Sequence, residues 1–241
     1  MLKSGVWVKV CRFRRRPERL TELDLPIDLS KIISAPNPIC IDVGANTGQT
    51  VNYLVRFLHH PTILAFEPST ECFKILQEKV TKKFSKAHVK LFNLAVGPTP
   101  GSVELINFRN SCLNSVLEMD RVAENRFQNE KESFRETVKM TTIDAIAAQE
   151  ALERIDLLKI DTQGFDLEVL KGAKCAIDAG KIRYILVEQN FVAMYRRQAQ
   201  AGDIQAFLQE RGFHLIGYYE IARVKYTKAW CTALYGRART G

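Results

Sequence analysis

The 241-residue chain lacks the features of several common protein classes. No charge-free apolar run approaches the roughly 18–20 residues that a membrane span requires. The six cysteines are scattered, without a C-x-x-C pair and without histidines at ligand spacing, which argues against a zinc-finger pattern and a disulfide framework. Cys40 and Cys72 fall in apolar patterns and are expected to be small core residues, so we expect a reduced, cytoplasmic protein. The missing apolar run predicts that the chain has no membrane span.

The chain also lacks the G-x-G-x-x-G turn by which dehydrogenases hold a pyrophosphate. In its place residues 39–50 read ICIDVGANTGQT, in which an apolar run ends at Asp42 and is followed by Gly44 and Gly48. An amphipathic pattern begins at Val51, so a strand, a glycine turn and a helix are predicted in that order. The glycines let the backbone approach a ligand closely, and Asp42 favours a ligand with a cationic or hydroxyl-bearing part. S-adenosylmethionine, with its ammonium and sulfonium, fits this description.

A second acidic residue follows the next predicted strand, residues 62–66. Glu67 lies 19 residues after Gly48, close to the spacing at which a dinucleotide fold places its ribose-binding carboxylate. A carboxylate there can accept hydrogen bonds from two vicinal ribose hydroxyls. A third predicted strand, residues 89–96, would bring Asn93 and Ala95 near an adenine, although Asn93 is equally an ordinary polar group at a strand end.

The order of the remaining elements indicates the fold class. A fourth strand is predicted over residues 155–161 and a fifth over residues 182–188, with a helix over residues 165–177 between them. Two further strands, residues 213–219 and 227–235, are close enough in sequence to pair antiparallel. Alternating strands and helices followed by such a pair predict an α/β, doubly wound, mostly parallel sheet with an antiparallel C-terminal strand pair.

Two segments fall outside this alternation. Residues 101–108 predict an extra strand or hairpin. Residues 118–136 are highly charged and weakly periodic, which predicts a surface helix or a mobile cover.

The net charge of +8 is concentrated at the two ends of the chain. Residues 1–19 carry seven Lys or Arg and one Glu, and residues 221–241 carry five Lys or Arg and no acid, which leaves a net charge of −3 between them. We interpret residues 1–36 as a basic N-terminal appendage and residues 37–241 as the functional domain. The basic end can contact nucleic acid, an anionic surface or an acidic partner. No aromatic stacking series accompanies it, so a solvated tail is favoured and nucleic acid is an unlikely partner.

Seven motifs occur in a fixed order between residue 39 and about residue 190: IDVGANTGQT, AFEPS, FNLAVG, SVL at residues 115–117, TTIDAI, LLKIDTQGFDLEVLKGA and ILVEQN. In this order and spacing they resemble the FkbM-type family of S-adenosylmethionine-dependent methyltransferases. The resemblance implies a Rossmann-like class I methyltransferase fold with a seven-stranded sheet. It also implies O-methylation of a hydroxyl on a small-molecule or glycan acceptor, namely a sugar, a glycan or a secondary metabolite. Gln163 departs from the family, which often has Glu at that position.

Two carboxylates are expected beside the transferred methyl group, because Asp161 and Glu188 end neighbouring strands. Aligning donor and acceptor contributes on the order of 7–11 kcal/mol at best, and a hydroxyl acceptor must also lose its proton. In one interpretation Asp161 is the base or orients the acceptor, and Glu188 binds a second hydroxyl. In the other, both bind a divalent cation. The absence of a clear third ligand favours the first, so no metal is expected. Asp161 can also cap the following helix.

The residues expected to bind S-adenosylmethionine share the crevice at the carboxyl edge of the sheet; they are Asp42, Gly44, Asn46, Thr47, Gly48, Glu67, Pro68, Asn93, Ala95 and Asp161. Two other functions stay open. One is an RNA or protein methyltransferase that uses the basic termini, although the N-P-P-[YF] signature of base methylation is absent. The other is a non-catalytic regulatory protein that binds the cofactor, against which the intact acidic and glycine positions argue.

Overall fold

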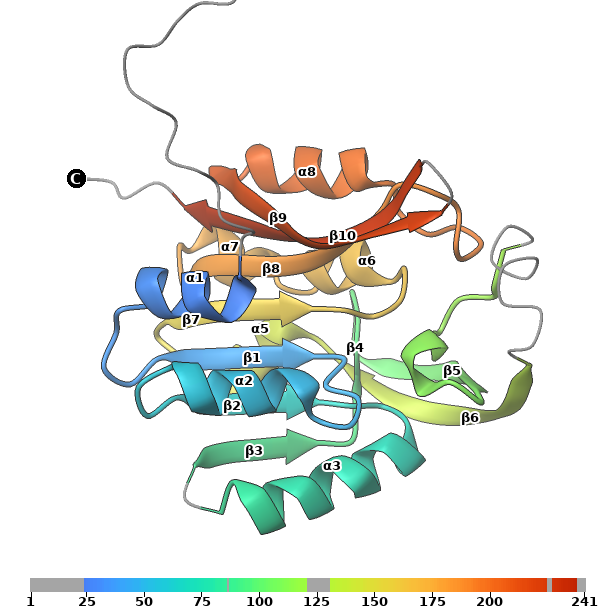
Figure 1. Cartoon of the computed structure of the whole chain (residues 1–241), viewed down its shortest axis with the longest axis horizontal. Coiled ribbons are helices and arrows are strands. Elements are labelled where there is room, and N and C mark those ends of the chain that lie inside the picture. The colour runs from blue at the N-terminus through green and yellow to red at the C-terminus, as the bar shows by residue number, and fades with distance from the viewer. Residues whose placement is uncertain (1–23, 86, 121–130, 225–226, 238–241) are drawn as a thin grey trace, which may run out of the picture.

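The computed structural model describes residues 24–85, 87–120, 131–224 and 227–237 (Figure 1). Its centre is a seven-stranded sheet in the order β3-β2-β1-β7-β8-β10-β9. The strands are β1 (Ile39–Val43), β2 (Thr62–Phe66), β3 (His88–Phe92), β7 (Ile155–Ile160), β8 (Ile182–Asn190), β9 (Phe213–Val224) and β10 (Thr227–Arg237). The first five strands of the sheet are parallel, and β10 runs antiparallel to both β8 and β9. The predicted α/β fold with an antiparallel C-terminal strand pair is confirmed.

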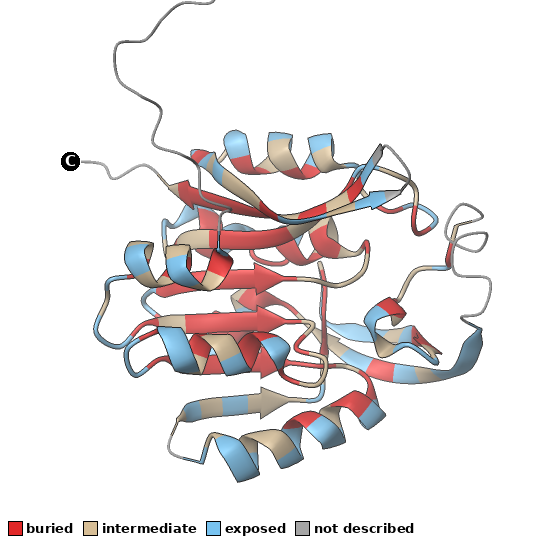
Figure 2. Cartoon of the chain, in the orientation of Figure 1, coloured by how far each residue is buried: buried red, intermediate tan, exposed pale blue. Residues whose placement is uncertain are grey.

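Helices cover both faces of this sheet and bury most residues of its central strands (Figure 2). One face carries α1 (Leu25–Ile32), α2 (Gln49–Phe57) and α3 (Thr70–Lys83). The other carries α5 (Ile143–Gln149), α6 (Asp166–Lys171), α7 (Lys174–Asp178) and α8 (Ala201–Gln209). Every residue of β7 is buried, as expected for a strand covered on both faces.

A smaller sheet lies beyond the arrowheads of the parallel strands (Figure 1). It contains β4 (Ala95–Val96), β6 (Glu132–Thr141) and β5 (Gly101–Phe108), in that order, and the short helix η1 (Ser111–Leu113) follows β5. The extra strand predicted over residues 101–108 is confirmed. The single strand predicted over residues 89–96 is wrong, because the chain leaves the large sheet after Phe92 and enters the small one at Ala95.

The helix predicted over residues 165–177 is two helices, α6 and α7. The break falls at Gly172, where the chain packs directly on the loop after β4. A Cβ atom at this position would lie 2.0 Å from the carbonyl oxygen of Gly97. The close approach of two backbones therefore requires glycine at the end of α6.

The N-terminal segment is described only from residue 24. Leu25, Leu29 and Ile33 are buried in the core shared with α2, and Tyr219 donates from its hydroxyl to Asp28 on α1. Residues 24–33 thus help to cover the sheet, and the boundary at residue 36 stays a prediction. The basic residues 1–19 lie outside the described residues, as do residues 121–130 of the charged segment 118–136, which from residue 132 onward forms β6.

In the described part of the chain, no helix is both long enough and apolar enough to span a membrane.

Candidate active site

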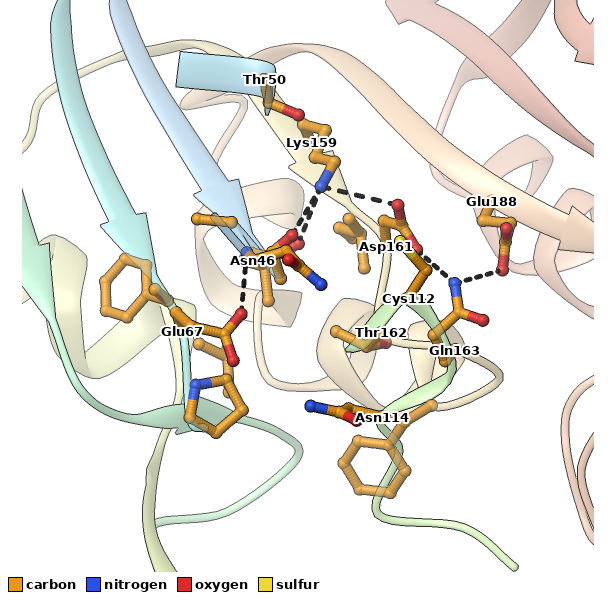
Figure 3. A pocket seen from close by; sticks show the side chains of 18 of the residues that line it. Asn46, Thr50, Glu67, Cys112, Asn114, Lys159, Asp161, Thr162, Gln163 and Glu188 are labelled. Carbon is orange, nitrogen blue, oxygen red and sulfur yellow. Dashed lines mark hydrogen bonds and ion pairs between the residues drawn. The ribbon is translucent and has the colours of Figure 1, made fainter. Parts of the chain in front are cut away.

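A cavity of about 320 Å³ lies at the carboxyl edge of the large sheet, where the strand order reverses between β1 and β7. Open α/β sheets bind their ligands at this switch point. The cavity reaches both faces of the sheet: Phe66 and Phe165 belong to the core beneath α5–α8, whereas Leu25 and Leu186 belong to the core beneath α1–α3. Figure 3 shows its polar side chains converging from the ends of several strands.

The turn after β1 forms one wall of the cavity. Gly44 has φ +77°, and a Cβ atom there would lie 1.9 Å from the carbonyl oxygen of Asp161. Only glycine therefore fits at this point, where the chain after β1 touches the chain after β7. Asn46 also has a left-handed φ of 47°, which Asn tolerates better than most residues. Its side-chain amide donates to the carbonyl of Ser111 at 3.0 Å and thereby ties the turn to η1.

Glu67, at the end of β2, presents a buried carboxylate to the same cavity. It accepts a hydrogen bond from the backbone N–H of Asn46 and one from that of Ser69, each at 2.8 Å. Burial raises the pKa of Glu67 to about 7, and these two hydrogen bonds oppose the shift. A carboxylate has about four lone-pair sites, so capacity remains for two further donors. These two free acceptor positions fit a pair of vicinal hydroxyls, which would donate to them.

Asp42 and Lys159 form an ion pair beneath the glycine turn, with 3.0 Å between Nζ and Oδ1. They are partners in the β1–β7 register, so pairing of the two strands places them side by side. The Lys159 ammonium also donates to the carbonyl of Gly44 at 2.9 Å. Although burial favours the neutral amine, the carboxylates of Asp42 and Asp161 raise the pKa of Lys159. The charge of Asp42 is thus balanced inside the protein.

Asp161 and Glu188 are linked by the amide of Gln163 (Figure 3). Gln163 Nε2 donates to Asp161 Oδ1 at 2.8 Å and lies 3.4 Å from Glu188 Oε2. The buried Tyr195 hydroxyl lies 3.0 Å from Gln163 Oε1 and 3.2 Å from the Leu113 carbonyl oxygen, and its one proton can be donated to either. Burial raises the pKa of Glu188 well above its usual value, and the charge of Asp161 adds to this effect.

The loop after β7 is held by Asp166, a residue that the sequence reasoning missed. Its buried carboxylate accepts from the backbone N–H groups of Thr162 and Gly164 at 3.0 and 3.1 Å. Burial raises the pKa of Asp166 to about 6. The expectation that Asp161 caps the following helix is wrong. The residue before α6 is Phe165, and the N–H groups of Thr162 and Gly164 donate to Asp166 instead.

The structure brings most of the predicted site residues to the cavity. Its walls include Gly44, Asn46, Glu67, Pro68, Ala95, Asp161 and Glu188. The predicted residues outside the lining are Asp42, Thr47, Gly48 and Asn93. Asn93 instead holds the backbone that carries Glu67, because its side-chain amide donates to the backbone carbonyls of Glu67 and Pro68, each at 2.9 Å.

Other lining residues were not predicted. Lys159 and Gln163 belong to the quoted motif LLKIDTQGFDLEVLKGA, which was the available signal for them, while Thr232 and Glu220 carry no sequence signal.

The arrangement suits a ligand with a planar apolar group, a diol and a positive charge. Phe66, Leu94, Val96 and Phe165 form an apolar slot, and Glu67 offers acceptors beside it. Asp161 and Glu188 add two more carboxylates. Within the described part of the chain, no basic side chain approaches either of them as closely as Lys159 approaches Asp42. Among the described residues, no cluster of three or more His, Cys, Asp or Glu could hold a metal ion.

The strand order and the switch-point cavity define a class I methyltransferase fold. The methyltransferase FkbM of Methylobacillus flagellatus superposes with a TM-score of 0.53 at 16% sequence identity, over 83% of this chain and 44% of that one, so this chain spans less than half of that protein. Residues 42–215 match the methyltransferase FkbM domain. The chain therefore belongs to the FkbM methyltransferase family.

Two curated relatives support this assignment. Methyltransferase sdnD of Sordaria araneosa is 28% identical over 203 residues, which are 74% of this chain and 74% of that protein. The 2-O-methyltransferase NoeI of Sinorhizobium fredii is 20% identical over 208 residues, 82% of this chain and 84% of NoeI. The expected family is thereby confirmed, and this protein is a methyltransferase.

Proposed function

We propose that the protein transfers a methyl group from S-adenosylmethionine to a hydroxyl of a small-molecule or glycan acceptor. The observation that carries the proposal is the carboxylate of Glu67, held at the end of β2 beside an apolar slot and the turn at Gly44. A nucleoside fits this arrangement, with its base in the slot and its two ribose hydroxyls donating to Glu67.

The charges of the cavity favour a cationic donor. Asp42 is neutralised by Lys159, whereas Asp161 lies 3.8 Å from the same ammonium and its side chain is 42% exposed. Asp161 therefore offers negative charge to a ligand from the edge of β7. When bound, S-adenosylmethionine supplies an activated methyl group on a positively charged sulfur.

The residues of the chain would align and deprotonate the acceptor. Gln163 fixes the Asp161 carboxylate from one side, so its second oxygen can orient an acceptor hydroxyl and take its proton. Glu188, on the neighbouring strand, is placed to accept from another hydroxyl of the same molecule. The relative NoeI is by name a 2-O-methyltransferase, which supports oxygen as the acceptor atom.

Isothermal titration calorimetry tests the donor half of the proposal. S-adenosylmethionine and S-adenosylhomocysteine should bind, and NAD should not. At pH 8, above the pKa of Glu67, Glu67→Gln should weaken binding by about 10- to 150-fold, because hydrogen bonds to a charged group contribute about 1.5–3 kcal/mol. Glu71→Gln, which removes the same charge from an exposed position on α3, is the matched control. Tighter binding of NAD than of S-adenosylmethionine would overturn the assignment.

A further inference from the structure

Two carboxylates lie side by side at the edge of the large sheet, with an amide between them. In the parallel β7–β8 register Ile160 pairs with Val187. The next residue on each chain is a carboxylate, Asp161 or Glu188, so the two lie on neighbouring strands roughly 4.8 Å apart. Gln163 Nε2 lies 2.8 Å from Asp161 Oδ1 and 3.4 Å from Glu188 Oε2 (Figure 3). The side chain of Gln163 therefore joins the two carboxylates.

The end of the Gln163 amide that faces the carboxylates is its NH2 group. An ionised carboxylate accepts hydrogen bonds and donates none, so an amide oxygen in this place would find no donor on Asp161. At the other end, Oε1 lies 3.0 Å from the Tyr195 hydroxyl, which can donate to it. An amide NH2 group is a donor only and offers no lone pair to a metal ion. This arrangement thus joins the carboxylates without ligating a cation.

The backbone of Gln163 is held in an uncommon conformation that aims this side chain. Its φ of 53° lies in the left-handed region, where residues other than glycine are strained. Ser115 Oγ donates to the Gln163 carbonyl at 2.8 Å, and Ser115 is itself buried. Ser115 begins the SVL motif at residues 115–117, and its backbone pairs with Ile106 of β5. The segment next to the small sheet therefore anchors the residue that joins the carboxylates.

The negative charge of the pair is stabilised mainly by neutral groups. The basic group beside it, the Lys159 ammonium, is 3.8 Å from Asp161 Oδ2 but 3.0 Å from Asp42 Oδ1, so it pairs mainly with Asp42. Glu188 Oε2 also receives a second side-chain amide, that of Asn190, at 3.4 Å. Hydrogen bonds from neutral amides stabilise a carboxylate and leave its charge in place.

A divalent cation is the other group that could join two carboxylates on neighbouring strands. Mg²⁺ and Mn²⁺ prefer carboxylate oxygens, and Mg²⁺ lies about 2.1 Å from each. A cation here would compete for the oxygens with which Asp161 takes a proton from an acceptor hydroxyl. The Gln163 amide takes up only Oδ1, so Asp161 keeps its charge and its second oxygen for that step.

We propose that Gln163 is the positioning residue of the carboxylate pair, and that its amide occupies the place of a divalent cation between Asp161 and Glu188. The inference rests on the proposed methyl transfer, and it assigns removal of the acceptor's proton to Asp161 without metal assistance. It has a consequence that is independent of turnover. Gln163→Glu exchanges the NH2 donor for a charged oxygen at nearly the same volume, so three carboxylates would then converge on one point and bind a cation.

Electron paramagnetic resonance tests this consequence with MnCl2 as the probe at pH 7.5, because free and bound Mn²⁺ give different signals. The wild type should bind Mn²⁺ with a Kd above about 1 mM, and Gln163→Glu should bind it at least about tenfold more tightly. Adding Asp161→Asn to that variant should remove the gain. Gln77→Glu, the same change at an exposed position on α3, is the control and should bind Mn²⁺ like the wild type.

Two further variants test the place of the amide and its anchor. Gln163→Ala adds no charge but empties the space between the carboxylates, so water-ligated Mn²⁺ should bind about three- to tenfold more tightly than to the wild type. Ser115→Ala, added to Gln163→Glu, should weaken Mn²⁺ binding by about tenfold or more, because a residue that orients a metal ligand commonly contributes that much.

Anomalous diffraction from Gln163→Glu crystals soaked in MnCl2 should place the ion within about 2.3 Å of oxygens from both Asp161 and Glu188. Equally tight binding of Mn²⁺ by the wild type overturns the inference. So do an ion bound elsewhere and the lack of any gain in both variants of Gln163. These measurements use neither methyl donor nor acceptor, so such results leave the proposed function standing. Failure of the wild type to bind S-adenosylmethionine overturns the proposed function instead.

Discussion

The raised pKa of Glu67 predicts a specific change in how stability depends on pH. The side chain is 4% exposed, and burial raises its pKa from 4.5 to about 7. Between these two pH values the folded chain keeps a proton that the unfolded chain has released. Protons bound in excess by the folded state make the free energy of unfolding fall as pH rises. This one group should therefore cost about 3 kcal/mol of stability between pH 4.5 and pH 8.

Glu67→Gln cannot titrate and should lack this contribution. For a chain of this length, 3 kcal/mol corresponds to roughly 6–12 °C in Tm. Differential scanning fluorimetry from pH 4.5 to pH 8 should thus show the Tm of the wild type falling by that much more than the Tm of Glu67→Gln. Glu71→Gln, at an exposed position, should follow the wild type. Parallel pH profiles for wild type and Glu67→Gln would refute the idea that the folded protein holds a proton on Glu67.

Three further changes test other parts of the structure. Lys159→Met leaves the buried Asp42 carboxylate unpaired and should lower the free energy of unfolding, measured in urea, by about 3–5 kcal/mol. Adding Asp42→Leu to this variant should restore most of the lost stability. Equal stability of the single and the double variant would contradict the ion pair. Asp161→Asn should lower kcat by ~10²–10⁴-fold with the Kd for S-adenosylhomocysteine nearly unchanged, and EDTA should not inhibit the wild type. Normal turnover by Asp161→Asn would remove its catalytic role. A chain starting at residue 37 loses three buried apolar side chains of about 1.5–3 kcal/mol each and should melt well below the full chain. Identical Tm values would show that α1 contributes nothing to the core.

The sequence was sufficient for those parts of the fold that depend on local pattern. Short stretches of sequence were enough to predict the glycine turn after β1, the carboxylate at the end of β2 and the alternation of strands and helices. The parallel arrangement follows from that alternation, because parallel strands need crossover helices. The path of residues 89–96 was not predictable in this way. Its two halves are continuous in hydrophobic pattern, and the division depends on β6, which pairs with Ala95 and Val96 from far along the chain.

The site shows the same division between local and long-range information. From the sequence, Asp42 was expected to favour a ligand with a cationic or hydroxyl-bearing part, because it directly precedes the glycine turn. The structure instead pairs it with Lys159, a neighbour only through the β1–β7 register. Glu220 and Thr232 reach the cavity through a bulge between two antiparallel strands, and no sequence rule specifies where that register shifts. Residues fixed by strand pairing therefore required the structure.

A crystal structure with S-adenosylhomocysteine tests the central claim most directly. The ribose hydroxyls should lie within hydrogen-bonding distance of both Glu67 oxygens, the base should occupy the slot between Phe66 and Phe165, and the sulfur should face Asp161. A nucleoside bound away from Glu67, or protein with no S-adenosylhomocysteine in the cavity at saturating concentration, would contradict it.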